Sequence, residues 1–511
     1  MILKGGNLNI SAINVPGGYV QEIAPPPALQ GAPSNILGIV GTATWGPANS
    51  PVLVGDYNTF QANFGPLTLG ANDLGTPLWL AMMQGANNFQ LVRVTDGTDV
   101  AAHLTLMDTT AVTPVAGATL TSIHTGTFGN KLTAAITAGS VAGAFNLTLS
   151  MPGASPEQFT NISGAGATFW ANLVSAVNNG QSGIRGPSQL TLATIGAGTA
   201  APNIVTTYTA ASGTDGNTTI TATVMMGTDG TTRTGMYALR NTGCAVAMLA
   251  GVTDTTSWPN QITLANSEGW EAILVGPSGQ SIATAITAKA TAAVDDTSFK
   301  VLLGDWIYFQ DSINNQLRLV SPQGITAGIR ATLSPEQSIL NKQVYGVVAT
   351  QKTSANQVYS YADLSALATA RIDVIGAPSP GGGYFSHLLG INGSSNAVTM
   401  GDEYTTLTNF LAKSINGNVG IFVGRLQTPD EQREAGDFLE DWLQTLKDPQ
   451  AGSSSGVIQD YSVQLNASNN PQGSVELGFQ IANVMVKYFG VVRYFIVNLI
   501  GGSSVQTTVQ G

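Results

Sequence analysis

Hydrophobic and polar residues alternate one by one near the start of the chain, and this period of two predicts β-strands. In residues 7–13, NLNISAI, the leucine, the first isoleucine and the alanine fall on one side, and the asparagines and the serine fall on the other. A second strand is predicted over 18–23, GYVQEI, and the prolines at 25–27 then force an extended connection. Neither strand has an obvious partner nearby in the sequence.

From residue 36 the pattern changes to buried strands that alternate with helices. Strands are predicted at 36–43 and 89–94. Between them, one helix is expected after Asp56 as its N-cap, and another after Thr76 as its N-cap with Pro77 at the first helical position. The alternation resumes after residue 235, with strands at 244–249, 271–277 and 299–304, helices at 258–268 and 279–293, and a hairpin over 306–320.

The intervening segment has a different composition, rich in Thr, Ala and Gly. It carries short strand patterns, at 131–139 and 145–151 for example, and one helical pattern at 167–179. The final third predicts helices at 402–415, 428–448 and around 475–489, strands at 461–466 and 491–499, and an alternating strand again at 504–510.

These patterns together predict a multidomain α/β (α+β) fold. An α/β core would be assembled from N- and C-terminal parts, carry an inserted β-rich domain and be flanked by extended terminal β-arms. The expected divisions are an N-terminal arm at 1–27, the core at 28–95 and 236–375, the inserted domain at 96–235, a C-terminal domain at 376–500 and a C-terminal arm at 501–511. The glycine pairs that would let the arms swing are Gly17 with Gly18 and Gly501 with Gly502.

The composition points to a subunit of an assembly. Charged residues make up 10% of the chain, against about 25% in ordinary soluble proteins. We expect no membrane insertion, because no apolar run is long enough, and no export, because the first residues lack the apolar region of a secretion signal. With a net charge of −11 and no Lys/Arg cluster, we expect no nucleic-acid partner. A surface covered by copies of the same chain fits this composition best.

Residues for metal, cofactor or covalent chemistry are sparse, and we expect neither an enzyme nor a cofactor. His103, His124 and His387 lie at no metal-ligand spacing from another His, from Cys or from paired carboxylates. The single cysteine, Cys244, lies among apolar residues and is expected to be buried. GSSSG at 452–456 matches the G-x-S-x-G pattern of hydrolases, but it lies in a Gly/Ser loop and not between a strand and a helix.

Several segments, in order along nearly the whole chain, resemble the tail sheath proteins of contractile phage tails and related injection machines. PGGYVQEI at 16–23 resembles a P-G-x-Y-x-x-E stretch of that family, and WGPANSPVLV at 45–54 resembles its G-P-x-N-x-P loop. TGTFGNKLTAAI at 125–136 resembles a G-N segment of the family's inserted domain, and SPQGITAGIRATLSPEQ at 321–337 resembles a G-x-V-A-G stretch followed by Ser-Pro. The segment 376–395 departs from the family's pattern.

The resemblance implies a structural subunit with no chemical turnover. Copies would stack as hexameric rings in a helical sheath around an inner tail tube, and contraction would drive the tube through the host cell envelope for genome delivery. The implied partners are further copies of the chain, the inner tail tube protein, and baseplate and tail terminator proteins. The implied location is the tail sheath of a virion, assembled in the host cytoplasm, and residues 376–500 would form its C-terminal sheath domain.

The resemblance also implies that the arms add strands to sheets of neighbouring subunits. Strand addition makes directional main-chain hydrogen bonds, which survive rigid-body motion when the linkers flex. The arm residues would be Tyr19, Val20, Gln21, Glu22 and Ile23 at one end and Val505, Thr507 and Val509 at the other.

The most charged stretch, 428–448, is predicted to be a helix with an apolar inward stripe and a capping box formed by Thr428 and Glu431. Its acidic face is either simply solvated or a docking surface, and it is our candidate for the helix that faces the tube. The candidate residues are Glu431, Glu434, Asp437 and Asp441.

Two other classes of protein stay open at this stage. A static surface-array or adhesin-like protein would also explain low charge and a β-rich Thr/Gly composition, but it should carry an export signal. An α/β hydrolase would rest on GSSSG, with Ser454 as nucleophile, and on the α/β core alone.

Overall fold

The computed structural model describes residues 2–3, 20–21, 29–204, 207–449 and 455–497. The chain forms two compact units. The smaller consists of Met1–Ala32 and Leu411–Val492, and the larger of Pro33–Phe410 and Arg493–Gly511. The domain boundaries predicted from the sequence remain predictions.

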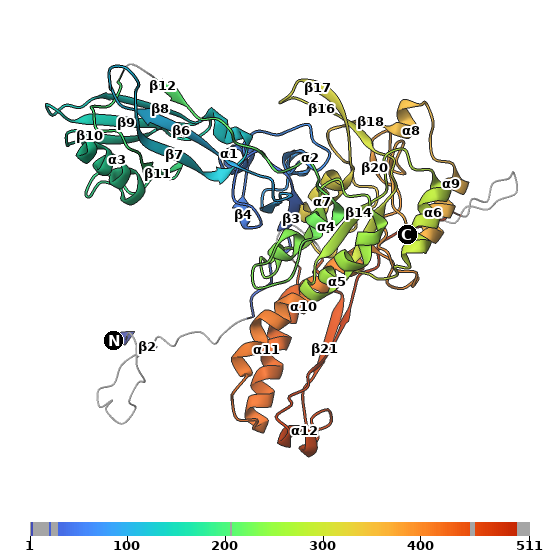
Figure 1. The fold of residues 1–511 in the computed structure, drawn as a ribbon. Coiled ribbons are helices and arrows are strands. Elements are labelled where there is room, and N and C mark those ends of the chain that lie inside the picture. Colours follow the sequence, from blue (N-terminus) through green and yellow to red (C-terminus); the bar gives the residue numbers. More distant parts are fainter. Residues whose placement is uncertain (1, 4–19, 22–28, 205–206, 450–454, 498–511) are drawn as a thin grey trace, which may run out of the picture. The chain divides into compact units, whose positions relative to one another are not determined.

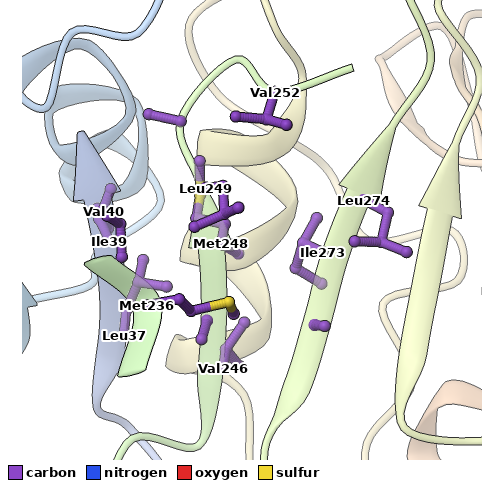
Figure 2. Packing of buried hydrophobic residues seen from close by; sticks show 14 of the residues in the cluster. Leu37, Ile39, Val40, Met236, Val246, Met248, Leu249, Val252, Ile273 and Leu274 are labelled. Atoms are coloured by element: carbon purple, nitrogen blue, oxygen red, sulfur yellow. The ribbon is translucent and has the colours of Figure 1, made fainter. Parts of the chain in front are cut away.

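The larger unit is built on a six-stranded sheet in the order β15–β14–β13–β3–β5–β4, parallel except for β4 at one edge. Its strands are β3 (Leu37–Gly41), β4 (Pro51–Val54), β5 (Phe89–Arg93), β13 (Val246–Leu249), β14 (Glu271–Val275) and β15 (Phe299–Leu302). The predicted α/β fold class is confirmed, because β13 pairs with β3 across the insertion. Leu37 lies opposite Val246, and Figure 2 shows both among the buried side chains of the core.

Helices contribute to the same hydrophobic core. They are α1 (Tyr57–Phe64), α2 (Gly75–Met83), α5 (Trp258–Glu268), α6 (Ile282–Ala292), α7 (Gln323–Thr332) and α9 (Tyr361–Ala370). Asp56 caps α1 as predicted, with its carboxylate accepting the Thr59 N–H at 2.8 Å. The prediction of Thr76 as the N-cap of α2 is wrong. The N-cap is Leu74, which makes no side-chain cap bond, and the carboxylate of Asp73, one residue earlier, accepts both the N–H of Thr76, at 2.6 Å, and its hydroxyl, at 2.7 Å.

The inserted segment forms strands and one helix of its own (Figure 1). Its hydrophobic core includes Phe159, Trp170 and Leu147. Two antiparallel sheets, β10–β9–β8–β12 and β11–β7–β6, pack with helix α3 (Ala167–Asn179), which has the bounds that its pattern predicts. The strands are β6 (Ala101–Met107), β7 (Ala116–Thr125), β8 (Thr133–Ala138), β9 (Phe145–Ser150), β10 (Glu157–Ile162), β11 (Thr191–Ile195) and β12 (Thr207–Thr209). Gly117 lets Trp170 lie against β7, because a Cβ there would lie 2.1 Å from the indole ring.

Arg93 joins the inserted domain to the core. Its buried guanidinium donates hydrogen bonds to the carbonyl oxygens of Ala43 and Gly46 on one side of the junction. On the other side it donates to the carbonyl and hydroxyl oxygens of Thr125 and to the carbonyl of Asp215. One side chain therefore links the core to the two segments of the chain through which the inserted domain begins and ends.

The remaining elements of the larger unit are short. They are the strands β16 (Ile307–Asp311), β17 (Gln316–Val320), β18 (Val347–Thr350), β19 (Ile375–Gly376) and β20 (Ser386–His387), the helices α4 (Ala222–Met226) and α8 (Gln351–Ser354), and the 3-10 helices η2 (Thr127–Lys131), η3 (Gly235–Leu239) and η4 (Thr255–Ser257). The predicted hairpin is present as β16 and β17, with Asn315 in a left-handed conformation (φ 51°) in the turn.

In the smaller unit, α10 (Asp402–Asn418) enters from the larger one and is followed by η5 (Val419–Phe422) and α11 (Pro429–Lys447). A two-stranded antiparallel sheet of β21 (Asp460–Gln464) and β22 (Asn483–Lys487) lies beside α11, with the short helix α12 (Gln472–Glu476) between its strands (Figure 1).

Two predictions for the end of the chain are wrong. The helix expected around 475–489 is only α12, and the chain continues as strand β22, where Val484 and Val486 alternate with exposed residues. Valine disfavours helix and favours strand, and pairing with β21 decides between them. The strand expected at 491–499 is also absent, since residues 491–497 adopt no regular secondary structure.

Candidate assembly surfaces

The predicted arms lie mostly outside the described residues. Val20 and Gln21 form the short strand β2 (Val20–Gln21), which pairs in parallel with β1 (Ile2–Leu3) of the same chain. Addition to a neighbour's sheet would extend or replace that pairing, and it stays a prediction. The other arm and hinge residues lie outside the described part of the chain: Gly17, Gly18, Tyr19, Glu22, Ile23, Gly501, Gly502, Val505, Thr507 and Val509.

The acidic helix α11 borders a groove in the smaller unit with a cavity volume of about 690 Å³. Apolar side chains from three segments line it, namely Leu29, Phe422 of η5, and Phe438 and Trp442 of α11. Phe422 and Phe438 meet edge to face, with their ring centroids 5.4 Å apart. The apolar lining places the groove among surfaces that commonly take part in binding.

Acidic side chains surround the same groove. Of the four residues predicted to face the tube, Glu434, Asp437 and Asp441 line the groove, and Glu431 does not. Arg425 offsets part of the charge, because it pairs with both Glu431 and Glu434 at 3.1 Å. Arg433 also lines the groove, where it pairs with Asp430 at 2.9 Å. No ion pair is found for Asp437 or Asp441 among the described residues, so the groove presents net negative charge. A positively charged partner surface would complement it.

The capping box predicted at the start of α11 is half correct. Thr428 accepts the N–H of Glu431 at 3.2 Å, as an N-cap should. The Glu431 carboxylate instead pairs with Arg425, a residue of the preceding loop that the pattern of the helix alone did not reveal.

The sheet β21–β22 is a second candidate surface. Within the described residues it has two strands only, so each strand leaves one edge unpaired. Met485 of β22 is 63% exposed. Unpaired main-chain groups on a short, half-exposed sheet offer a site for strand addition.

The chain segment that leads towards the C-terminal arm is anchored and then exposed. Arg493 pairs with Glu403 at 2.8 Å and donates to the carbonyls of Leu389 and Gly390. The four apolar residues that follow are largely exposed: Tyr494, Phe495, Ile496 and Val497. Exposed apolar residues in a row indicate a surface that another chain covers.

A cluster of charges lies buried in the larger unit, next to Arg493. Lys300 of β15 lies 3.1 Å from Asp373 and 3.3 Å from Asp402, and all three side chains are inaccessible to solvent. Lys300 also donates to the carbonyl of Ile391 at 2.6 Å, and Ser338 donates to Asp402 at 2.6 Å. Asp402 begins α10, so the cluster fixes the start of the helix that enters the smaller unit.

The cluster shifts the pKa of its members. Burial alone would favour neutral groups, but the charge of Lys300 holds the pKa of Asp373 and of Asp402 below the ordinary value. The carboxylates in turn raise the pKa of Lys300 against its own burial. Glu271 differs, because burial dominates over Lys300 and Arg330 and raises its pKa to about 7. Within the part of the chain that the structure describes, neither of its carboxylate oxygens has a hydrogen-bond partner.

Glu271 should therefore make the free energy of unfolding depend on pH. Its raised pKa means that the folded state favours the neutral carboxyl, a contribution fully present below about pH 4 and lost as the pH rises towards 7. Glu271→Gln cannot titrate, so its free energy of unfolding relative to the parent should rise by on the order of 3 kcal/mol between about pH 4 and about pH 8, because each unit of pKa shift corresponds to about 1.4 kcal/mol. Hydrogen exchange of the β14 amides measures this locally. A difference that stays constant with pH would contradict the assignment.

The structure also bears on the hydrolase alternative. Thr326, His387 and Asp373 lie in the order of a nucleophile, a base and an orienting acid, with His387 3.2 Å from Thr326 and 3.3 Å from Asp373. All three are buried without solvent-accessible surface, so no substrate reaches them. His387 belongs to the short strand β20, and both residues of that strand are buried. Ser454 lies outside the described residues.

Other chemistry predicted from the sequence has plain outcomes. Cys244 is buried, as expected. In the described part of the chain, no group of His, Cys, Asp and Glu is arranged to hold a metal ion. The helices that the structure describes include none that is long and apolar enough to cross a membrane.

The segments that carried the family resemblance hold the fold together. Gly324 and Gly328 allow α7 to pack closely on α2, since a Cβ at Gly328 would lie 2.4 Å from Ala81. Asn130 binds the main chain of Gly213 through both its amide oxygen and its amide nitrogen. Asn49 accepts the N–H of Gly235. These residues fix junctions between segments, and this explains their value as a signature.

Comparison with solved structures gives extensive matches. A sheath tail protein from Desulfitobacterium hafniense is 13% identical, with a TM-score of 0.55 over 88% of this chain and 93% of that one. A sheath tail protein from Listeria innocua is 9% identical, with a TM-score of 0.57 over 90% and 96%. The sheath of an extracellular contractile injection system in its contracted state is 10% identical, with a TM-score of 0.54 over 96% and 99%. Neither a protein-family model nor a curated protein matches the sequence.

At these identities the matches concern the fold, and they cover it almost from end to end. The chain has the multidomain α/β fold of sheath subunits from contractile machines. The resemblance to contractile tail sheath proteins that its sequence motifs indicated is thereby confirmed.

Proposed function

We propose that this chain is the structural subunit of a contractile sheath. Copies polymerise as stacked hexameric rings around an inner tube, and their rearrangement drives the tube through the envelope of a host cell for genome delivery. The observation that carries the proposal is the match to sheath proteins over 88% to 96% of the chain, in both tail and injection-system proteins. The protein acts in the tail of a virion and is assembled in the host cytoplasm.

The proposed mechanism uses stored conformational free energy and no chemical turnover. A subunit that moves between two packings of the same surfaces needs to contribute only a few kcal/mol, because many subunits act together. The scarcity of charged residues supports this role, since a subunit in a lattice has most of its surface covered.

The proposed partners are further copies of the chain, the inner tube protein, and baseplate and terminator proteins. Likeness to a contracted anti-feeding prophage baseplate chain, 12% identical with a TM-score of 0.52, supports association with a baseplate. For the arms, we assign the unpaired edges of β21–β22 as the acceptor, because strand addition there satisfies main-chain groups that a single chain leaves open.

Electron microscopy of the purified protein tests the proposal. Negatively stained samples should contain rings or tubes once the concentration is raised. A protein that stays monomeric at every salt and protein concentration would rule out the sheath role. A static surface array would instead give flat sheets that never change their spacing.

Charge reversal tests whether α11 faces the tube. Changing Glu434 and Asp437 to Lys should abolish polymerisation on purified tubes, because the groove would then present the wrong sign to a basic partner. Cosedimentation with tubes measures the effect. The control carries the same charge change at Glu440 and Glu476, which are exposed and do not line the groove. Equal cosedimentation of both variants would mean that another surface faces the tube.

A further inference from the structure

The chain next to the N-terminal arm is held by two side chains of α10. Asn418 accepts the N–H of Gln30 at 3.3 Å and donates to the carbonyl of the same residue at 2.9 Å. Ser414, one helical turn earlier, accepts the N–H of Ala32 at 2.8 Å. Residues 29–32 have no regular secondary structure, so these contacts take the place of a helix or a sheet.

These contacts recognise the main chain and not particular side chains. An amide side chain offers one acceptor and two donors, and therefore matches the N–H and C=O of a single residue. A further bond, from Asn418 to the carbonyl of Ser414 at 2.7 Å, fixes the orientation of the amide. Ser414 is 1% exposed, so its bond to Ala32 is partly shielded from water.

Leu29 adds an apolar anchor at the same place. Only 6% of its surface is exposed, and it lines the acidic groove together with Trp442. Residues 29–32 therefore belong to the smaller unit, although they are followed in sequence by Pro33, the first residue of the larger unit.

We propose that Asn418 and Ser414 are positioning residues that clamp the root of the N-terminal arm onto α10, and that the clamped Leu29 completes one wall of the groove. The mechanical role of this clamp rests on the proposed sheath function. When a neighbouring copy exerts force on the arm, the clamp transfers that force to α10. The force is then not transmitted through residues 33–36 to strand β3 of the core.

Hydrogen exchange of the full-length subunit tests the clamp itself. In Asn418→Ala the amide of Gln30 should exchange at least about tenfold faster than in the parent, because this N–H loses its hydrogen-bond acceptor. Ser414→Ala should affect Ala32 more than Gln30. The control is Asn416→Ala, the same substitution at an exposed position of the same helix. Unchanged exchange in Asn418→Ala would overturn the clamp.

Sheath assembly tests the role. Tubes of Asn418→Ala should lose subunits when contraction is triggered, whereas the parent and Asn416→Ala should keep theirs. Faster exchange with full retention of subunits would show that the contacts do not position the arm. A parent that forms no tubes would refute the sheath function, while the exchange result would still decide whether the clamp exists.

Discussion

Subunits that lack residues 1–24 or residues 503–511 are expected to stay folded and soluble but to form no tubes. Among the described residues, the three main hydrophobic clusters are built from residues between Leu37 and Ile375, all of the larger unit, and neither deleted segment falls in that range. What deletion removes is the strand that would complete the sheet of a neighbouring copy. Gel filtration and negative-stain microscopy measure the result, with circular dichroism to show that the fold is intact.

A pair of point variants sharpens this experiment. Val20→Pro removes the main-chain donor and should abolish assembly, whereas Val20→Thr keeps that donor and should assemble normally. Normal tubes from either truncated subunit would refute strand exchange by that arm. Failure of Val20→Thr would point instead to packing of the side chain.

Lys300→Met is expected to cause the largest loss of stability. Without the ammonium group, Asp373 and Asp402 remain as buried, uncompensated carboxylates, and breaking such a pair costs about 3–5 kcal/mol. The loss should be greater at pH 8 than at pH 5, because the stranded carboxylates can take up protons as the pH falls. Urea unfolding, together with hydrogen exchange of the β15 amides, measures the loss.

Lys352→Met is the matched control. Lys352 pairs with Asp363 at 3.7 Å in a partly exposed position, where an ion pair contributes at most about 1 kcal/mol. Equal losses in the two variants would show that the buried cluster does not stabilise the start of α10. Adding Asp402→Asn to Lys300→Met should recover part of the loss, since one of the two stranded charges is removed.

Local patterns predicted much of the fold because they carry their own end signals. Helix α3 lies between Gly166 and Gly180, and its apolar face is periodic, so its bounds follow from the sequence. The prediction failed at strand β22, because Val484 and Val486 lie in a stretch whose apolar spacing also suits a helix. Only pairing with β21 decides between strand and helix. Strand β4 was missed because it is short and begins with Pro51.

The candidate surfaces also divide into features that a local sequence pattern predicts and features that depend on residues far apart in the sequence. The acidic residues of α11 were found from the sequence, because their exposure follows from helical periodicity. The groove beside them was not predicted, because one of its walls is Leu29. This residue lies some 400 positions before α11 (Pro429–Lys447) in the sequence. The buried pair of Lys300 and Asp402 was missed for the same reason, since nothing in a local pattern marks a charge as buried.

The junction at Arg93 has a consequence for how such proteins diversify. Of the five oxygens that its guanidinium binds, four are main-chain carbonyls and one is the hydroxyl of Thr125. The hydrogen bonds of Arg93 therefore depend very little on which side chains the inserted domain carries. A different β-rich module whose ends offer carbonyls at these places could be exchanged into the same core, so the insertion can change its sequence and its outer face while the α/β core is conserved.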